Sequence, residues 1–186
     1  MSARTILFLA AIVVFVAVLV VVAVYYHRRG RRTSDGSWEQ LLERLTFVDR
    51  DGVAQIALDY ADESGRRRTE DSDTGLEPSQ IWKLIGGLDG LELLEKNCPV
   101  LIDLASYVQQ WYPEAVVLAE ELRLNAREIE WHVERLRGAA KTGNMELSFA
   151  NYAQPAIAKY YLMTRRVLAL YERGNLPMLT DLQRVI

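Results

Sequence analysis

The first pattern along the chain is an unbroken apolar run near its N-terminus. Every residue from Ile6 to Val24 is Ile, Leu, Phe, Ala or Val, a run of 19 that Tyr25 and Tyr26 extend to 21. About 20 apolar residues, at a rise of about 1.5 Å each, cross the roughly 30 Å hydrocarbon core of a bilayer. Only a helix lets a single segment satisfy its own backbone hydrogen bonds in lipid. The run therefore predicts a transmembrane helix over residues 6–26, after a short tail over residues 1–5.

The flanks of this run distinguish a retained anchor from a cleaved secretory signal. A signal peptide has a shorter apolar stretch, of about 7 to 15 residues, and ends in a small-x-small cleavage site. Here the run ends in two tyrosines, His27 and a pair of arginines. These flanks favour a signal-anchor that is kept, and so a single-pass membrane protein.

Basic residues around the run predict its orientation. Four arginines follow it, whereas Arg4 is the one basic side chain before it. Because Lys and Arg are retained on the cytoplasmic side, we expect the N-terminus outside the cell membrane and the C-terminal domain in the cytoplasm. Residues 27–36 then form a basic juxtamembrane linker. Its aromatic and basic side chains are expected to contact lipid headgroups; these membrane-interface residues are Tyr25, Tyr26, Arg28, Arg29, Arg31 and Arg32.

Residues 37–186 show the spacing of amphipathic helices and predict one cytoplasmic helical domain. Its first predicted helices are Ser37–Val48, with Ser34 or Asp35 near its N-cap, and Gly52–Ala61, capped by Asp51. The first of these has its apolar residues on one face: Trp38, Leu41, Leu42, Leu45 and Val48.

A charged stretch separates these helices from the next ones. Residues 62–75 contain no apolar residue between Ala61 and Leu76, and they include three consecutive arginines. This composition predicts a mobile loop.

Proline and glycine predict the boundaries in the middle of the domain. Glu77-Pro78-Ser79 predicts a helix start, and Gly86-Gly87 with Gly90 predicts that this helix is bent or split. Pro99 is expected to end that segment. A further helix over Val100–Tyr112 is apolar around its circumference and should be central, and Pro113 predicts the next boundary.

Two long apolar seams then predict an antiparallel helical hairpin. The first helix is expected over Glu114–Ala140 and the second begins after the turn at residues 141–144, with Pro155 as a kink and Gly174 as its C′ stop. A short helix over Met178–Ile186 follows. Because each seam spans about three heptads, packing within a bundle is favoured over an intermolecular coiled coil. The seams are Ala119, Leu122, Ala126, Ile129, Val133, Leu136 and Ala140, and Phe149, Ala153, Ala156, Tyr160, Met163, Val167 and Leu170.

Charge is unevenly distributed between the two parts of the chain. Residues 1–32 hold five arginines and no acid, whereas the remaining residues carry 17 basic and 25 acidic side chains. The domain should therefore be repelled by phosphates, which argues against nucleic acid as a partner. Cys98 is the one cysteine. It excludes an internal disulfide and is interpreted as a buried structural thiol rather than a reactive or metal-bound one.

Candidate chemical motifs are few, and each has a simpler interpretation. Glu128 and His132 are four residues apart and could share a metal ion, but a His beside the seam that pairs with Glu128 is the favoured interpretation. Asp49-Arg50-Asp51-Gly52 resembles the middle of a calcium loop, although both end ligands are missing, so a helix-connecting turn is favoured. Nucleophile-elbow and phosphate-loop motifs are absent from the sequence.

Two further features remain open after these exclusions. Thr69 follows three arginines, and a phosphate on it could pair with their guanidinium groups, although a solvated loop is favoured. Five bulky aromatic residues could line a pocket or a partner surface, although core packing is the favoured interpretation. They are Trp111, Tyr112, Trp131, Tyr160 and Tyr161.

The sequence therefore predicts an all-α, membrane-anchored protein without a recognisable catalytic motif, and no cofactor is expected. The favoured function is a non-enzymatic interaction, scaffold or regulatory module at the cytoplasmic membrane face, whose partners are the lipid bilayer and other proteins or a second copy of the chain. The alternative is a membrane-tethered ligand-binding sensor or enzyme with a site assembled from distant residues. Such a site is expected as a pocket between the hairpin and the Val100–Tyr112 helix.

Overall fold

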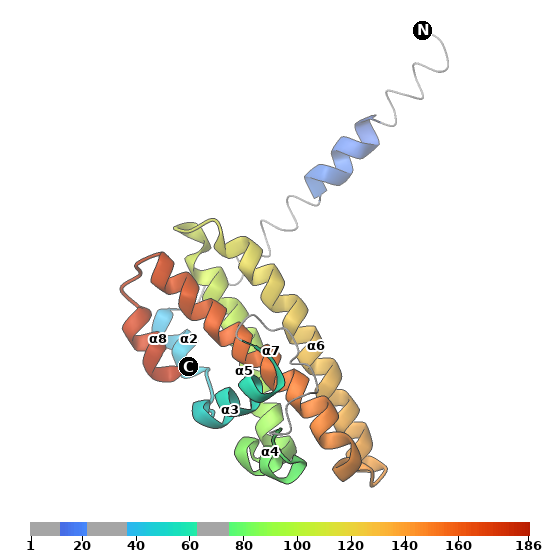
Figure 1. Cartoon of the computed structure of the whole chain (residues 1–186). Coiled ribbons are helices and arrows are strands. Elements are labelled where there is room, and N and C mark those ends of the chain that lie inside the picture. The colour runs from blue at the N-terminus through green and yellow to red at the C-terminus, as the bar shows by residue number, and fades with distance from the viewer. Residues whose placement is uncertain (1–11, 22–36, 63–74) are drawn as a thin grey trace, which may run out of the picture. The chain divides into compact units, whose positions relative to one another are not determined.

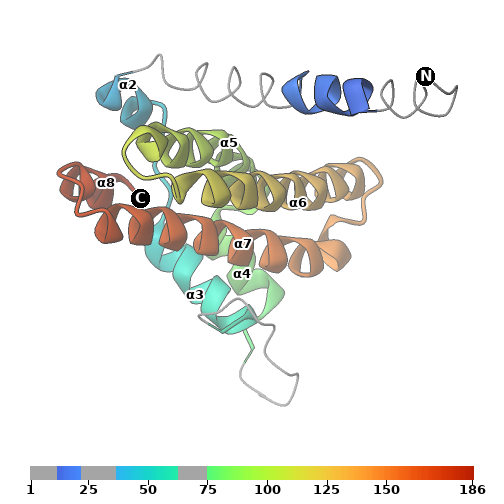
Figure 2. The same ribbon diagram turned by 90° about the horizontal axis from the view of Figure 1, so that it is seen from above.

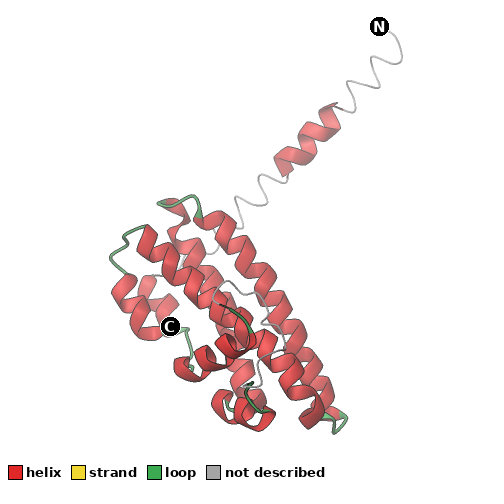
Figure 3. Cartoon of the chain, viewed as in Figure 1, coloured by secondary structure: helices red, strands yellow, loops and turns green. Residues whose placement is uncertain are grey.

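The computed structural model describes residues 12–21, 37–62 and 75–186. Every regular element in these ranges is a helix, which confirms the all-α fold class (Figure 3). The chain divides into two compact units, residues 1–37 and residues 38–186. The predicted loop at 62–75, with Thr69 inside it, lies almost entirely outside the described residues.

The described part of the first unit is a helix over residues 12–21, all of which are exposed. Within the ranges that the structure describes, no helix is both long enough and apolar enough to cross a membrane. The remainder of the predicted span, at 6–11 and 22–26, lies outside those ranges, as does the predicted linker over 27–36 with all the predicted membrane-interface residues.

The second unit begins with α2 (Trp38–Glu43), which is shorter than predicted. The prediction of a helix to Val48 is wrong, because the backbone of Thr46 forms hydrogen bonds with the side chain of Asn97 in a later helix. The Thr46 N–H donates to Asn97 Oδ1 at 2.9 Å, and Asn97 Nδ2 donates to the Thr46 carbonyl at 2.7 Å. Tertiary hydrogen bonds thus replace the last turn of the predicted helix.

Helix α3 (Arg50–Tyr60) begins two residues earlier than predicted, because its N-cap is Asp49 and not Asp51. Asp49 Oδ1 accepts from the N–H groups of Asp51, at 3.2 Å, and Gly52, at 3.3 Å. The carboxylate therefore satisfies two of the free N–H groups that open a helix. Residues 50–52, interpreted from sequence as part of a connecting turn, are instead the first turn of α3.

Helices α4 (Pro78–Ile85) and α5 (Gly87–Tyr107) are split at the glycines, as predicted. Gly86 and Gly87 have φ values of 80° and 67°, which favour glycine. A Cβ on Gly87 would lie 2.7 Å from the Trp82 ring, and one on Gly90 would lie 1.7 Å from the Ile85 carbonyl oxygen. These glycines therefore permit both the bend and the close contact of the two helices.

The prediction that Pro99 ends a helix is wrong, because α5 continues through it to Tyr107. Proline costs a helix one hydrogen bond and some steric strain. Burial offsets this cost, since Cys98, Val100 and Leu101 around it are all buried in the core. A 3-10 turn, η1 (Val108–Gln110), then ends the segment.

The predicted hairpin is confirmed as α6 (Ala115–Lys141) and α7 (Met145–Arg173), which lie side by side and antiparallel (Figures 1 and 2). All seven residues of the second seam are buried. The first seam is buried or partly buried as far as Leu136, whereas Ala140 is exposed. Burial of the seams within one chain confirms bundle packing, and α7 runs unbroken through Pro155.

The end of α7 differs in detail from the prediction. Gly174 is the C-cap with a helical φ of −75°, and the left-handed residue after it is Asn175, with φ of 45°. The N–H of Leu176 donates to the Tyr171 carbonyl at 3.1 Å, which makes this a Schellman ending with Asn175 at C′. Helix α8 (Leu179–Val185) follows close to its predicted position.

One large core joins α2 to α8, and among the described residues Asn97 is the buried side-chain amide, at 1% exposed. Besides its two bonds with Thr46, Asn97 donates to the Tyr160 hydroxyl at 3.2 Å. The amide therefore joins the segment after α2 to α5 and α7.

We predict that Asn97→Ala lowers the free energy of unfolding by about 2–3 kcal/mol, because it leaves buried polar groups unpaired. The measurement is urea unfolding of the full chain, followed by tryptophan fluorescence. Asn151→Ala, on the exposed side of α7, is the matched control and should change stability little. Amide exchange at Thr46 should also accelerate selectively in Asn97→Ala, and unchanged exchange there would contradict the role of this amide.

Candidate functional site

A largely apolar groove lies between α4 and the start of α7, with a volume of about 600 Å³. We call it the α4–α7 groove. Its lining residues are Pro78, Ser79, Trp82, Lys83, Met145, Glu146 and Phe149.

The residues of each helix determine where the two walls of the groove lie. On α4, Pro78 occupies the first helical position, and the Glu77 N–H donates to Gln80 Oε1 at 2.9 Å, so the helix starts at a defined residue. On α7, Phe149 is part of the buried seam and is 2% exposed. The centroids of the Trp82 and Phe149 rings are 4.5 Å apart. The two helices thus meet through an aromatic pair, and both residues line the groove.

Trp82 is the residue of this groove that could be inferred from sequence. It follows Ile81, which is fully buried, yet Trp82 itself is 42% exposed. Adjacent bulky residues on a helix point about 100° apart, so both cannot face the same core. The pairing with Phe149 could not be inferred, because 67 residues separate the two positions.

The five aromatic residues singled out from sequence do not meet in one site. Trp111 and Trp131 are exposed on different parts of the domain, at 54% and 48%. Tyr160 and Tyr161 line a separate, smaller pocket that opens between α3, α7 and α8. A pocket was expected between the hairpin and residues 100–112. The pocket that Tyr160 and Tyr161 line is in a different place, because α7 lines it but α5 does not.

His132 lies beside the hairpin seam, but its environment differs from the prediction. Glu128 forms an ion pair with Lys159 of α7 at 2.8 Å and is thus occupied. The His132 ring packs against Trp131 and Tyr152, with centroid separations of 4.9 and 6.0 Å. Its Nδ1 is buried and has no hydrogen-bond partner among the described residues.

The charge state of His132 follows from these neighbours. Burial lowers the pKa of His132, Glu128 opposes that shift, and Lys159 adds to it. Throughout the described ranges, no group of three or more His, Cys, Asp or Glu side chains is placed to hold a metal ion. His132 is therefore best described as a neutral ring that packs at the edge of the core.

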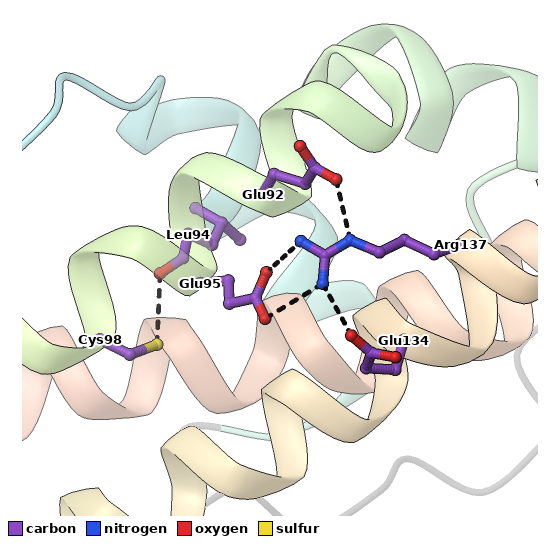
Figure 4. Close-up of polar contacts among 6 residues, drawn as sticks. All are labelled: Glu92, Leu94, Glu95, Cys98, Glu134 and Arg137. Carbon is purple, nitrogen blue, oxygen red and sulfur yellow. Dashed lines mark hydrogen bonds and ion pairs between the residues drawn. The ribbon is translucent and has the colours of Figure 1, made fainter.

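Cys98 is a buried thiol, as predicted. Its Sγ–H donates to the Leu94 carbonyl at 3.2 Å (Figure 4). Burial raises the pKa of Cys98 to about 12, with a smaller contribution from the charge of Glu95. At neutral pH the group is a thiol, which is a poor nucleophile and metal ligand.

The strongest charged cluster joins α5 to α6 through Arg137 (Figure 4). Its Nε donates to Glu92 Oε1 at 2.9 Å, its Nη2 to Glu95 Oε2 at 2.7 Å, and its Nη1 to Glu134 Oε1 at 3.1 Å. The hydrogen bonds to Glu95 and Glu92 raise the pKa of Arg137 above its ordinary value. Because one guanidinium occupies three carboxylates, the cluster is best explained as a joint between helices.

The lowered pKa of His132 predicts a pH dependence of stability. In the unfolded chain the ring binds a proton below about pH 6.5, whereas the folded ring does so only at lower pH. The unfolded state then holds more protons in this window, so stability falls as pH decreases through and below about 6.5. The measurement is urea unfolding of the full chain at pH 7.5 and at pH 5.5. The free energy of unfolding should fall less between these two pH values for His132→Gln than for the unsubstituted chain. An equal loss in both would show that other groups cause it.

Comparisons with known proteins do not assign this arrangement to a family. No protein-family model matches the sequence, and no similar curated protein or solved structure is found. The groove, the polar clusters and the N-terminal apolar run are therefore the features from which a function can be inferred.

Proposed function

We propose that this chain is a single-pass, membrane-anchored helical protein that docks other proteins at the cytoplasmic membrane face without catalysing a reaction. The observation that carries the docking role is the open, apolar α4–α7 groove. The anchoring role is supported by the apolar run over residues 6–26. The anchoring role and the docking role belong to different parts of the chain, so each is tested separately.

The anchor is supported first by composition. Residues 12–21 form a helix made wholly of Ile, Val, Phe, Ala and Leu, and they lie at the centre of a run long enough to cross a bilayer. A helix that is apolar on all sides has no polar face to present to water. The four arginines after the run support an N-terminus outside and a domain in the cytoplasm.

The occupant we propose for the groove is an amphipathic helix of a partner protein. The two walls of the groove are helices, α4 and α7, and the groove volume of about 600 Å³ exceeds that of a single side chain. Trp82 supplies a large rigid contact area, while the flexible side chain of Met145 can adapt to the partner. Lys83 and Glu146 provide opposite charges, so the partner helix should present an acid and a base beside its apolar anchors.

We predict that the full chain stays in the membrane fraction after alkaline carbonate extraction. In sealed, right-side-out cells, added protease should leave the C-terminal domain intact, because it lies inside. Val14→Arg with Val18→Arg should release the protein, since each charge at the centre of a span costs about 2.5–3.5 kcal/mol. Val116→Arg with Val117→Arg, on exposed positions of α6, is the matched control. Digestion of the domain from outside would contradict the orientation, and extraction of the unsubstituted chain would contradict the anchor.

For the groove, we predict that a photo-crosslinking residue at Ser79 forms adducts with a defined protein in intact membranes. A crosslinker at Glu130, on the exposed side of α6, should not form the same adducts. Met145→Glu should reduce the Ser79 adducts at least about tenfold, because it places a charge in an apolar contact.

A pair of charge reversals supplies a test that leaves the core untouched. Lys83→Glu with Glu146→Lys should also weaken the Ser79 adducts, whereas Lys141→Glu with Glu172→Lys, at exposed positions outside the groove, should not. Adducts that are the same from Ser79 and Glu130, or that survive Met145→Glu, would overturn the docking role of the groove.

A further inference from the structure

The side of α6 that faces away from the bundle carries a row of exposed apolar residues. Val117, Leu124 and Trp131 are 73%, 64% and 48% exposed and are spaced seven residues apart. Because seven residues make almost two turns of a helix, these side chains lie on one face, along about 21 Å of it. The buried seam of α6 lies on the opposite face, against α5 and α7. We call the exposed side the outer α6 face; its residues are Val117, Glu120, Leu124, Arg127, Glu128, Trp131, Arg135 and Gly138.

The next position of this row is a glycine. Gly138 follows Trp131 by seven residues and lies inside the helix, where glycine is less favourable than alanine. A Cβ at Gly138 would have no atom of the described residues within 4 Å, so packing within the chain does not require a glycine here. A glycine on an exposed helix face allows another molecule to approach the backbone closely. This end of the row is therefore suited to a contact from outside the chain.

Trp131 is held in place although about half of it is exposed. Its ring contacts Tyr152 of α7 edge to face, with the centroids 5.8 Å apart, and the Arg135 guanidinium carbon lies 5.1 Å from its centroid. Because these neighbours restrict the ring, little conformational entropy is lost when another molecule covers it. Tryptophan is also among the residues that most often supply the binding energy of an interface.

The charged residues beside this row have opposite signs on the two sides of its midpoint. Counted outward from the point between Arg127 and Glu128, these two residues correspond to each other, and Glu120 corresponds to Arg135. In an antiparallel pair of α6 helices centred at this point, each residue lies at the height of the corresponding residue of the other copy. Two-fold symmetry then places an acid level with a base four times. A parallel pair would instead place each charge level with the same charge.

The apolar residues are aligned by the same midpoint. Leu124 corresponds to Trp131, and Val117 corresponds to Gly138. In the antiparallel pair, Leu124 of each copy therefore meets the tryptophan ring of the other. Val117 meets the glycine, which leaves room for its branched side chain.

One correspondence is unfavourable, because Glu121 lies level with Glu134 of the other copy. Both carboxylates already form ion pairs within their own chain, Glu121 with Arg166 and Glu134 with Arg137. The two guanidinium groups reduce the repulsion between these acids. The like-charged pair therefore opposes the association only weakly.

The two acids that meet a base of the other copy retain an oxygen for it. Glu120 pairs through Oε1 with Arg123, and Glu128 pairs through Oε2 with Lys159. A carboxylate accepts at both of its oxygens, so each acid can also bind a guanidinium of the second copy. Arg127 has no carboxylate partner among the described residues. It gains one in the antiparallel pair.

We propose that two copies of this chain associate through the outer α6 face, as an antiparallel helix pair whose two-fold axis passes between Arg127 and Glu128. The contact is isologous, so it closes as a dimer and does not extend into a filament. It goes beyond the docking of partner proteins and does not depend on the α4–α7 groove, which is formed by other helices.

The first test is sedimentation equilibrium of the full chain in density-matched detergent, up to the highest concentration at which the chain stays dissolved. We expect a monomer–dimer equilibrium. Leu124→Glu should raise its dissociation constant at least about tenfold, because it places a charge in an apolar contact. Leu147→Glu, at an exposed position of α7, is the matched control and should leave the constant unchanged. A chain that stays monomeric, or a dimer that Leu124→Glu does not weaken, would overturn the proposal.

Charge reversal tests the alignment of the two helices. Glu120→Arg alone and Arg135→Glu alone should each raise the dissociation constant, because each places two like charges level with one another. The double variant exchanges the acid and the base, so it should return the constant towards that of the unsubstituted chain. A double variant that is weaker than both single variants would contradict the alignment.

Crosslinking tests the antiparallel direction. Glu120→Cys and Arg135→Cys copies, produced together in the same membranes, should be joined to each other by a short bismaleimide. Neither variant alone should be crosslinked, because identical positions are about 22 Å apart along the antiparallel pair. Cys98 is buried, and the unsubstituted chain is the control for its reactivity. Crosslinks between two Glu120→Cys copies would indicate a parallel pair and overturn the proposal.

Discussion

The fold depends on the burial of one broad apolar face of α5. Leu91, Leu94, Leu101 and Leu104 lie on this face and are all fully buried, whereas Lys96 and Pro99 on the other side of the helix are exposed. Helices α6 and α7 supply most of the cover of this helix, and α2 and α4 contact it elsewhere. A helix that is covered in this way can tolerate a proline, because packing stabilises it where a hydrogen bond is missing. The long hairpin is therefore held in place by α5 as much as by its own seams.

Sequence periodicity predicted the parts of the fold that repeat, and it missed those that depend on a single distant partner. The seams of α6 and α7 recur every three or four residues, so their faces and their pairing could be inferred without coordinates. The end of α2 is set by Asn97, 51 residues beyond Thr46. Nothing local distinguishes that amide from a surface asparagine. The α4–α7 groove escaped prediction for the same reason, since Phe149 also serves as an ordinary seam residue.

Charge is used differently inside the domain and at its N-terminal side. Ion pairs join the arms of the hairpin, from Glu121 to Arg166 and from Glu128 to Lys159. Partly exposed pairs of this kind contribute little to stability, commonly below about 1 kcal/mol, but they favour one register over others. The Arg137 cluster acts in the same way between α5 and α6. The five arginines of residues 1–32 have no acidic residue among them, and we propose that those at 28–32 contact anionic lipid headgroups.

Small residues explain why one helix, α7, can line both a groove and a pocket. Ala57 and Ala61 of α3 pack on Ala158 of α7 in a cluster of their own, and short side chains let two helices approach closely. This approach brings Arg50, at the other end of α3, towards the C-terminal half of α7. The groove is formed instead at the start of α7, where α4 takes the place of α3. About 15 residues, or roughly 22 Å of helix, separate Phe149 from Thr164. A larger residue at Ala57 should therefore displace the wall of the pocket while it leaves the groove unchanged.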